Sequence, residues 1–454
     1  MRGLKWRRML TPAPGTQKQT GNATRLIPFG MGLPFILVTS LFFLWGVPNN
    51  LNDVLIRQFM KSFAISRFQA GLVQSAFYLG YFLLAAPAAL LMRKYGYKVG
   101  FLAGLCLLGT GTLLFWPAAI VARYSFFLFA LFVIASGLAF LETAANPFIA
   151  QLGDGAGGAR RLNFSQAFNP LGSIAGVLVG TVFIFSGVEL NDGQIAAMRA
   201  AHTYEVYLRH ETLRVVNPYL VLGAVAFFLA FLIWRTKFPA VAGEENTVEG
   251  NHGSYSDLLR YPHFLLAILA QFMYVGAQVG TWSYFIQYVQ DSTHQPEKVA
   301  GYFLTGTLAA FGVGRFSSSV LMKYVRPGRL MGVYSVVNIA LVAAGILHPG
   351  WIGLWAIFAT SFFMSVMYPT IFALGIEGLG RNTKIGGSLI VMAIVGGAVL
   401  TPAMGLLSQY AHSIAVAYAI PLACYFFVAF YAFIGCRIGQ RSGASPSENE
   451  GYGL

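Results

Sequence analysis

The stretch FILVTSLFFLWGVPNNLNDVLIRQF, Phe35 to Phe59, begins as a continuous apolar run and ends in a polar segment. The apolar run is typical of a helix that crosses a lipid bilayer, for which about 20 mostly apolar residues are needed. The polar segment holds three asparagines and Asp53, which is the first acid of the chain. The stretch therefore predicts a membrane helix that carries a carboxylate within the membrane or at its edge.

Similar apolar runs recur along all 454 residues, of which 56% are hydrophobic and 10% are charged. A soluble domain carries about 25% charged residues. Backbone groups in lipid must be hydrogen-bonded internally, so the runs are expected to be helices. We predict an all-α membrane protein with twelve transmembrane helices, at residues 28–52, 68–92, 99–122, 125–151, 164–187, 215–237, 262–290, 298–323, 329–348, 350–375, 384–409 and 412–436.

The formal net charge of +14 is distributed unevenly between the two sides of these spans. With both termini on one side, 21 lysines and arginines fall on that side and 8 on the other. Positive residues accumulate in cytoplasmic loops, so both termini are expected in the cytoplasm. The basic balance therefore reflects membrane orientation, and we expect no nucleic-acid partner. The basic N-terminal residues have no apolar core beside them, which argues against a cleaved signal peptide.

A long polar interruption after the sixth span divides the chain into two halves. We predict a cytoplasmic tail at 1–27, a six-helix bundle at 28–237, a cytoplasmic linker at 238–261, a second six-helix bundle at 262–437 and a cytoplasmic tail at 438–454. The halves echo each other: ANPFIAQLG from Ala145 and MYPTIFALG from Met367 share Pro, Ile, Leu and Gly at an offset of 222. Likewise, Gly71 and Gly301 each stand twenty residues before a similar Leu-Met segment. Two six-helix repeats around a midplane site are typical of the major facilitator fold.

Two of the sixteen acids, Asp53 and Glu142, are predicted within or against the membrane, both in the first half. The others fall in loops, tails or at a helix end. The second half supplies one intramembrane cation, Arg315. A charge near the bilayer centre costs at least about 2.5–3.5 kcal/mol, so it normally faces a cavity and has a function. The structural alternatives are a carboxylate fixed by neighbouring helices for Glu142, and an acid that reaches water at the outer surface for Asp53.

Polar side chains also follow one face of several spans at the three- and four-residue spacing of a helix. Amide and aromatic side chains together suit a ligand that has several hydroxyls and an apolar face, as a sugar has. Hydrogen bonding between helices is the alternative for single members of the set. The set comprises Asn49, Asn50, Asn52 and Asp53 on the first span, Glu142 and Asn146 on the fourth, Gln166 and Asn169 on the fifth, Gln271, Tyr274, Gln278, Thr281 and Trp282 on the seventh, and Tyr368 on the tenth.

Six motifs resemble the fucose–galactose–glucose:proton symporter family over nearly the whole chain. They are FLWGVPNNLNDVLIRQF, QAGLVQSAFYLGYF, FLETAANPFIAQLG, RLNFSQAFNPLGS, YVGAQVGTWSYF and YPTIFALGI. The resemblance implies proton-coupled uptake of L-fucose, or a related monosaccharide, by alternating access across a bacterial inner membrane. It assigns proton coupling to Asp53 and Glu142. It assigns sugar binding to Asn50, Gln166, Asn169, Gln278, Arg315 and Tyr368, to which the polar pattern adds Asn146.

The resemblance further implies a multi-pass monomer in the lipid bilayer that needs no cofactor and is driven by the proton gradient. Burial disfavours a charged carboxylate, so protonation from outside would permit closure around the sugar. Glucose, galactose or N-acetylglucosamine are alternative substrates within the family, and Na⁺ is an alternative coupling ion. A sugar sensor without transport is an alternative of another class, and it would need a longer tail than SGASPSENEGYGL.

An enzyme is not expected, because the sequence contains no HExxH or GxSxG motif. Three cysteines, Cys106, Cys424 and Cys436, give neither a disulfide framework nor a metal site. One departure from the family pattern is Pro170, which follows Asn169 and is expected to alter the helix there.

Overall fold

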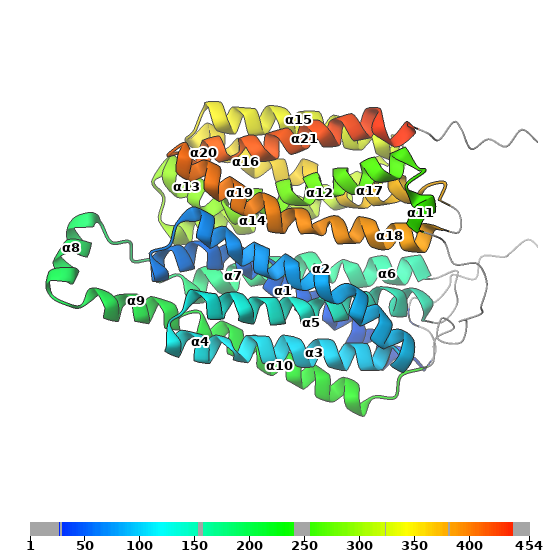
Figure 1. The fold of residues 1–454 in the computed structure, drawn as a ribbon, viewed down its shortest axis with the longest axis horizontal. Coiled ribbons are helices and arrows are strands. Elements are labelled where there is room, and N and C mark those ends of the chain that lie inside the picture. The colour runs from blue at the N-terminus through cyan, green and yellow to red at the C-terminus, as the bar shows by residue number, and fades with distance from the viewer. Residues whose placement is uncertain are drawn as a thin grey trace, which may run out of the picture.

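The computed structural model describes residues 27, 30–152, 158–239, 255–322, 324–379 and 382–438. The predicted N-terminal tail up to residue 26, residues 240–254 of the predicted linker and the C-terminal tail from residue 439 lie outside the described residues. In the described part the regular elements are helices that run side by side along the long axis of the molecule (Figure 1).

The first half begins with α1 (Gly32–Phe63), α2 (Arg67–Tyr95), α3 (Tyr97–Leu113), α4 (Phe115–Val121) and α5 (Tyr124–Gln151). It continues with α6 (Gly158–Gln166), α7 (Phe168–Val179), the π-helix η2 (Gly180–Ile184), α8 (Asp192–Ala200), α9 (Tyr204–Leu213) and α10 (Val216–Arg235).

The second half begins with the short α11 (Tyr255–Leu258), α12 (Pro262–Ser283), α13 (Phe285–Thr293), α14 (Glu297–Leu321) and α15 (Pro327–Leu347). It continues with α16 (Trp351–Met364), α17 (Met367–Ile376), α18 (Thr383–Met392), η4 (Ala393–Val395), α19 (Gly396–Tyr410), α20 (Ile414–Ala417), α21 (Ala419–Phe433) and η5 (Gly435–Arg437).

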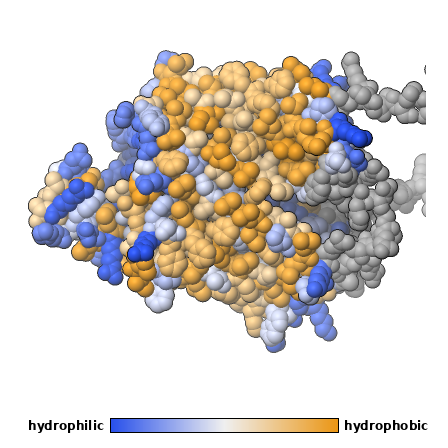
Figure 2. Space-filling model, in the orientation of Figure 1, coloured by the Kyte–Doolittle hydropathy of each residue, from blue (hydrophilic) through white to orange (hydrophobic). Residues whose placement is uncertain are grey.

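Eleven helical segments of the described chain are long and apolar enough to cross a membrane. The helix α14 has 25 residues and completes the predicted twelve, although Arg315 and four glycines lower its mean hydropathy. Hydrophobic residues cover the middle of the molecule and hydrophilic residues gather toward its ends (Figure 2). This distribution is what a bilayer requires, and the prediction of an all-α membrane protein is confirmed.

The two halves lie one above the other in Figure 1, with α1–α10 below and α12–α21 above. We call the end that carries α8, α9, α13 and α20 the α9 end, and the end that carries α6, α11, α17 and α18 the α18 end (Figure 1). The halves pack together along two seams, which are α2 against α19 and α7–η2 against α14.

Equivalent glycines line these two seams. A Cβ atom at Gly71 in α2 would come within 2.9 Å of the Pro402 Cα atom in α19. A Cβ atom at Gly301 in α14 would come within 2.3 Å of the Thr181 hydroxyl oxygen in η2. The second and eighth spans therefore use matching glycines to approach the eleventh and fifth, which agrees with an internal duplication.

Two spans are interrupted beside predicted site residues, and proline explains both breaks. Proline has no N–H group to bond to the carbonyl four residues before it. Pro170 follows the break between α6 and α7, as expected next to Asn169. Pro369 follows the break between α16 and α17 and leaves the carbonyl of Ser365 without its helical partner.

The predicted bounds differ from the structure in two places. The first span was predicted to end at residue 52, but α1 continues to Phe63. Its polar residues around Asn50 lie inside the helix because neighbouring helices cover them. The segment between the fifth and sixth spans was predicted as a loop, but it forms α8 and α9.

Candidate functional site

The Asp53 carboxylate lies deep between the helices, and its residue is 2% exposed. It accepts hydrogen bonds from Asn50 Nδ2 at 3.1 Å, from Gln74 Nε2 at 2.9 Å and from Ser283 Oγ at 3.0 Å. Asn50 is one helical turn before Asp53 in α1, Gln74 comes from α2, and Ser283 is the last residue of α12. The structural alternative, in which Asp53 reaches water at the outer surface, does not fit this conformation, since helices from both halves enclose the side chain.

Glu142 lies in α5 and is half-buried. Within the described part of the chain its carboxylate accepts no hydrogen bond and forms no ion pair, so neighbouring helices do not fix it there in the way the structural alternative requires. Tyr368 of the second half lies within electrostatic reach of Glu142, and Tyr78 lies within reach of both Asp53 and Glu142. Tyr78 thus lies near both acids, and Tyr368 brings the second half near Glu142.

The predicted amides of the first half lie near these acids and contact one another. Gln166 Nε2 donates to Asn146 Oδ1 at 3.3 Å, which joins α6 to α5 one turn beyond Glu142. Asn169 Nδ2 donates to the carbonyl oxygen of Phe42 in α1 at 3.4 Å. Gln166 is exposed, and Asn146 and Asn169 are half-buried. These side chains keep polar atoms available on the wall that faces the second half.

The second half contributes Arg315, Tyr368 and Gln278, all half-buried. Arg315 Nε donates to the Ser365 carbonyl at 3.4 Å, which is the carbonyl that Pro369 leaves unpaired. The Arg315 guanidinium carbon lies 5.1 Å from the centre of the Phe311 ring. Arg315 and Tyr368 lie within electrostatic reach of each other. The broken tenth span thus orients the one predicted intramembrane cation.

Two other members of the predicted polar stripe on α12 have hydrogen-bond partners, and a third, Gln271, is buried without one among the described residues. Tyr274 donates its hydroxyl to the Met364 carbonyl at 2.9 Å, at the same break between α16 and α17. Trp282 Nε1 donates to Ser361 Oγ at 3.0 Å. Gln271 is fully buried. For Tyr274 and Trp282 the alternative of hydrogen bonding between helices is the better description.

The site is closed toward the α9 end. Lys61 Nζ in α1 lies 3.2 Å from Glu297 Oε1 in α14 and 3.3 Å from Glu211 Oε2 in α9. Arg67 of α2 forms an ion pair with Asp291 of α13. Ser75 Oγ in α2 donates to the carbonyl of Ala398 in α19 at 2.6 Å.

Two acids of this closure correct the sequence analysis. Glu211 and Glu297 were expected in loops, but they are 4% and 0% exposed. Glu297 also accepts a hydrogen bond from the backbone N–H of Gly187. A buried carboxylate needs a cation or donors to offset its desolvation, and Lys61 supplies this to both acids. The sequence held no sign of the pairing, because the three residues are far apart in the chain.

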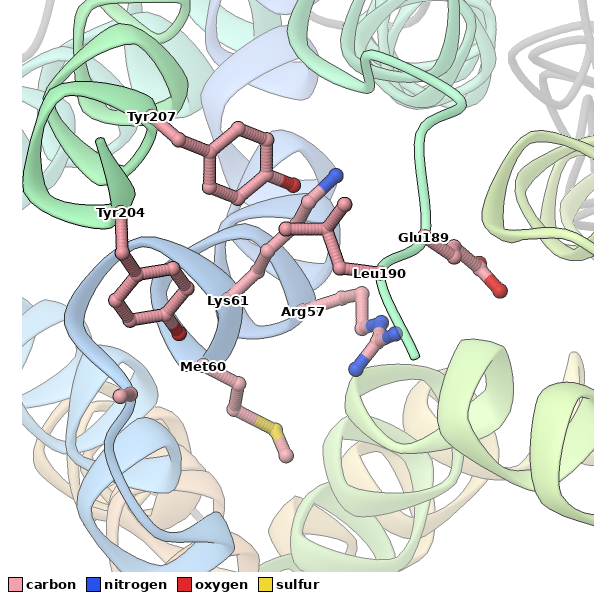
Figure 3. Close-up of a pocket in the computed structure, with 8 residues that line it drawn as sticks. Arg57, Met60, Lys61, Glu189, Leu190, Tyr204 and Tyr207 are labelled. Atoms are coloured by element: carbon pink, nitrogen blue, oxygen red, sulfur yellow. The ribbon is translucent and has the colours of Figure 1, made fainter. Parts of the chain in front are cut away.

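A cavity of about 180 Å³ opens beside this closure at the α9 end (Figure 3). Tyr204 and Tyr207 of α9 stand on one side of it, and Glu189 stands on the other. Arg57 and Lys61 of α1 extend between them. The cavity does not include Asp53 or Glu142, so it lies apart from the candidate site.

Toward the α18 end the site is more accessible, since Glu142, Asn146, Gln166 and Tyr368 are all partly or fully exposed. Glu142 and Tyr368 belong to different halves and lie within electrostatic reach of each other. The structure therefore places Asp53 at the interface between the halves, with ion pairs across the halves toward the α9 end. No group of three potential metal ligands was found among the described residues.

Gln74 and Ser283 were missed as site residues. Both stand inside motifs that carried the resemblance, QAGLVQSAFYLGYF and YVGAQVGTWSYF. Their spacing on α2 and α12 does not show that they meet Asp53, because that contact depends on how three helices from two halves are arranged.

Comparison with known proteins gives consistent results. The family model of the Major Facilitator Superfamily matches residues 35–393. The L-fucose-proton symporter of Escherichia coli (strain K12) is 43% identical over 407 residues, which are 88% of this chain and 92% of that protein. The glucose/galactose transporter of Brucella abortus biovar 1 (strain 9-941) is 34% identical over 418 residues, which are 89% of this chain and 95% of that protein. A crystal structure of a Major Facilitator Superfamily transporter in the outward conformation has 42% identity and a TM-score of 0.66, covering 88% of this chain and 97% of that chain.

Proposed function

The chain belongs to the Major Facilitator Superfamily, and from that premise we propose that it carries L-fucose, or a closely related monosaccharide, into the cell together with a proton. The relatives are transporters and not enzymes, in agreement with the sequence analysis. The observation that carries the proposal is Asp53, a buried carboxylate that hydrogen bonds join to both halves, with Glu142 as a second membrane acid near the same tyrosine, Tyr78.

The orientation follows from charge. The α18 end carries the excess of lysine and arginine, so we assign it to the cytoplasm, with the protein in a bacterial inner membrane. The closed α9 end then faces outward, and we infer that the described conformation is inward-facing. Alternating access requires the halves to separate at the α9 end and approach at the α18 end.

In this proposal Asp53 and Glu142 carry the proton. Asn50, Asn146, Gln166 and Asn169 from the first half and Gln278, Arg315 and Tyr368 from the second bind the sugar. Amides and a guanidinium offer donors and acceptors to hydroxyls, and the tyrosine rings offer an apolar face to the sugar ring. Residues from both halves must meet the sugar at once, so bound sugar favours closure around it. No cofactor is needed, and we expect a monomer to suffice.

Uptake of labelled L-fucose into proteoliposomes tests the proposal. An imposed inward proton gradient is expected to drive accumulation, and dissipating the gradient with a protonophore should abolish it. A Na⁺ gradient at constant pH tests whether Na⁺, the alternative coupling ion, drives accumulation instead. Competition by unlabelled D-glucose, D-galactose and N-acetylglucosamine shows which sugar the protein prefers. These competitors are included because a glucose/galactose transporter is also among the relatives. Accumulation without a response to pH would contradict proton coupling.

A further inference from the structure

Three hydrogen-bond donors surround the Asp53 carboxylate, and they differ in how they are attached. Asn50 belongs to the same helix and moves with Asp53. Gln74 belongs to a neighbouring helix of the same half. Ser283 belongs to the other half, and its hydroxyl reaches Asp53 at the level where the closure of the α9 end begins. Movement of one half against the other therefore changes this last contact most directly.

The direction of each hydrogen bond can be assigned from the groups present. Gln74 Nε2 carries two protons and lies 2.9 Å from both Asp53 Oδ1 and Ser283 Oγ. Ser283 accepts from Gln74, so its single hydroxyl proton is left for Asp53 Oδ1 at 3.0 Å. With Asn50 on Oδ2, the carboxylate accepts three hydrogen bonds and needs to donate none. This set of donors fits an ionised carboxylate.

We propose that Ser283 and Gln74 are positioning residues for proton coupling, which hold Asp53 in its ionised form while the α9 end is closed. The inference rests on the proposed proton-coupled transport. Separation of the halves at the α9 end withdraws Ser283 from Asp53 and leaves Gln74 without its second partner. Hydrogen bonds to the charged form of a carboxylate favour that form. The outward-open form therefore binds the proton more tightly than the inward-open form.

The proton gradient sets the direction of net transport, and this difference makes release of the proton easier on the cytoplasmic side. A proton taken up from outside is bound while Ser283 is distant, and it is released when closure of the α9 end returns Ser283 to the carboxylate. By linkage, ionised Asp53 favours the closed α9 end to the same extent that the closed end favours ionised Asp53. The three donors thus reverse the expectation from burial alone that a charged Asp53 opposes closure. The position of Ser283 at the end of α12 also suits it to leave Asp53 when the halves separate. Tyr284 interrupts the helix directly after Ser283, and α13 begins a new segment.

Other titratable groups near Asp53 occupy different positions. Tyr78 of α2 lies within electrostatic reach of it. Glu142 of α5 lies within reach of Tyr78. Arg57 is one turn further along α1 and lines the cavity at the α9 end. Tyr78, Arg57 and Glu142 all belong to the first half, so they do not leave Asp53 when the halves separate.

The experiment measures how lumenal protons inhibit uptake of labelled L-fucose into right-side-out vesicles, at a fixed acidic external pH. An acidic lumen should inhibit the wild-type protein, because the inward-open form then keeps its proton. Ser283→Ala removes a donor from the ionised form, so the lumenal pH of half-inhibition should rise by about one unit, a roughly tenfold tighter hold on the proton. Ser283→Thr keeps a hydroxyl and should restore the wild-type value.

Ser75→Ala is the matched control. It removes another hydrogen bond between the halves, to the Ala398 carbonyl, without touching Asp53. A change in the uptake rate of this variant is compatible with the proposal, but its lumenal pH of half-inhibition should equal that of the wild type. Gln74→Ala should raise the lumenal pH of half-inhibition, as Ser283→Ala does. It serves as the test variant if Ser283→Ala does not fold. A wild-type protein that ignores pH contradicts the proposed function. If lumenal protons inhibit the wild-type protein but the Ser283 and Gln74 variants have the same half-inhibition pH as the wild type, only the positioning role is overturned.

Discussion

Gly71 of α2 lies directly against Pro402 of α19, so closely that a Cβ atom at Gly71 would stand 2.9 Å from the Pro402 Cα atom and 2.8 Å from the Tyr284 hydroxyl. Gly405, on the same face of α19, is equally close to the backbone of Arg67. Both glycines lie where the two halves meet at the α9 end. The closed state of that end therefore requires the absence of side chains at these positions.

The first prediction concerns Gly71→Val. The added atoms overlap backbone that cannot move aside without separating the halves, so the α9 end cannot close and L-fucose transport should fall more than tenfold. Closure is measured separately by labelling the variant Gln287→Cys with a membrane-impermeant maleimide, in a background without Cys106, Cys424 and Cys436. Gln287 of α13 is buried against Met60 of α1 in the closed α9 end. The cysteine should be protected when Gly71 is present and reactive from outside in the Gly71→Val variant.

Gly312→Val is the matched control for that prediction. Gly312 also lies in a membrane helix, α14, but nothing stands within 4 Å of a Cβ atom built there. This variant should transport at close to the wild-type rate. Equal losses in both variants would mean that glycine substitution disturbs the helices in general, and the role of the seam would have to be abandoned.

The second prediction concerns Lys61, which is paired with both Glu297 and Glu211. Lys61→Met leaves two buried carboxylates without their cation, and removing one partner of a buried ion pair costs about 3–5 kcal/mol. Separation of the halves lets water reach Glu297, so the variant should favour the outward-open form by at least tenfold. The same cysteine-labelling assay reports this shift.

Asp291→Asn provides the comparison for Lys61→Met. Asp291 pairs with Arg67 across the same two halves, but its side chain is 43% exposed. Exposed ion pairs contribute little, so its effect on the labelling rate should be less than threefold. A larger effect from Asp291→Asn than from Lys61→Met would contradict the assignment of the closure to the buried pair.

The sequence predicted the fold well, because the features that define it are local. Apolar runs, loop charges and the repeated motifs are visible along the chain, and they indicated twelve helices in two related halves. The end of the first span was misplaced because Asn49 to Asp53 were treated as an exit from the membrane. In the structure α1 continues to Phe63, since helices of both halves cover those polar residues.

The candidate site was predicted less completely, for a physical reason. Helical periodicity shows that Asn50 and Asp53 share a face, but it does not give the distance to another helix. The contact of Gln74 depends on how α1 packs against the next helix, and the contacts of Ser283 and Lys61 depend on helices that are far apart in sequence. Burial of Glu211 and Glu297 likewise depends on the arrangement of the halves, and neither residue lies in an apolar run.

The third prediction concerns Arg315 and the break before α17. Pro369 frees the Ser365 carbonyl, and Arg315 Nε bonds to it, which orients the guanidinium. Arg315→Lys keeps the charge but loses the planar group that bonds the carbonyl and lies over Phe311, so the KM for L-fucose should rise at least tenfold. Pro369→Ala restores an N–H group that competes for the carbonyl, and should raise KM less. Unchanged KM in both variants would remove Arg315 from the proposed sugar site.

The last prediction separates exchange from accumulation at Asp53. Asp53→Asn keeps an oxygen that can accept from Ser283 and Gln74, so the closed α9 end should still form, but it cannot gain or lose a proton. Exchange of labelled for unlabelled L-fucose across proteoliposomes should persist within severalfold of the wild-type rate, whereas accumulation driven by a proton gradient should disappear. Asp192→Asn, at an exposed acid of α8, should leave both activities unchanged. Since Asp53 is enclosed by donors from both halves and Glu142 is half-buried near the α18 end, normal accumulation in Asp53→Asn would show that Glu142 alone couples sugar to the proton.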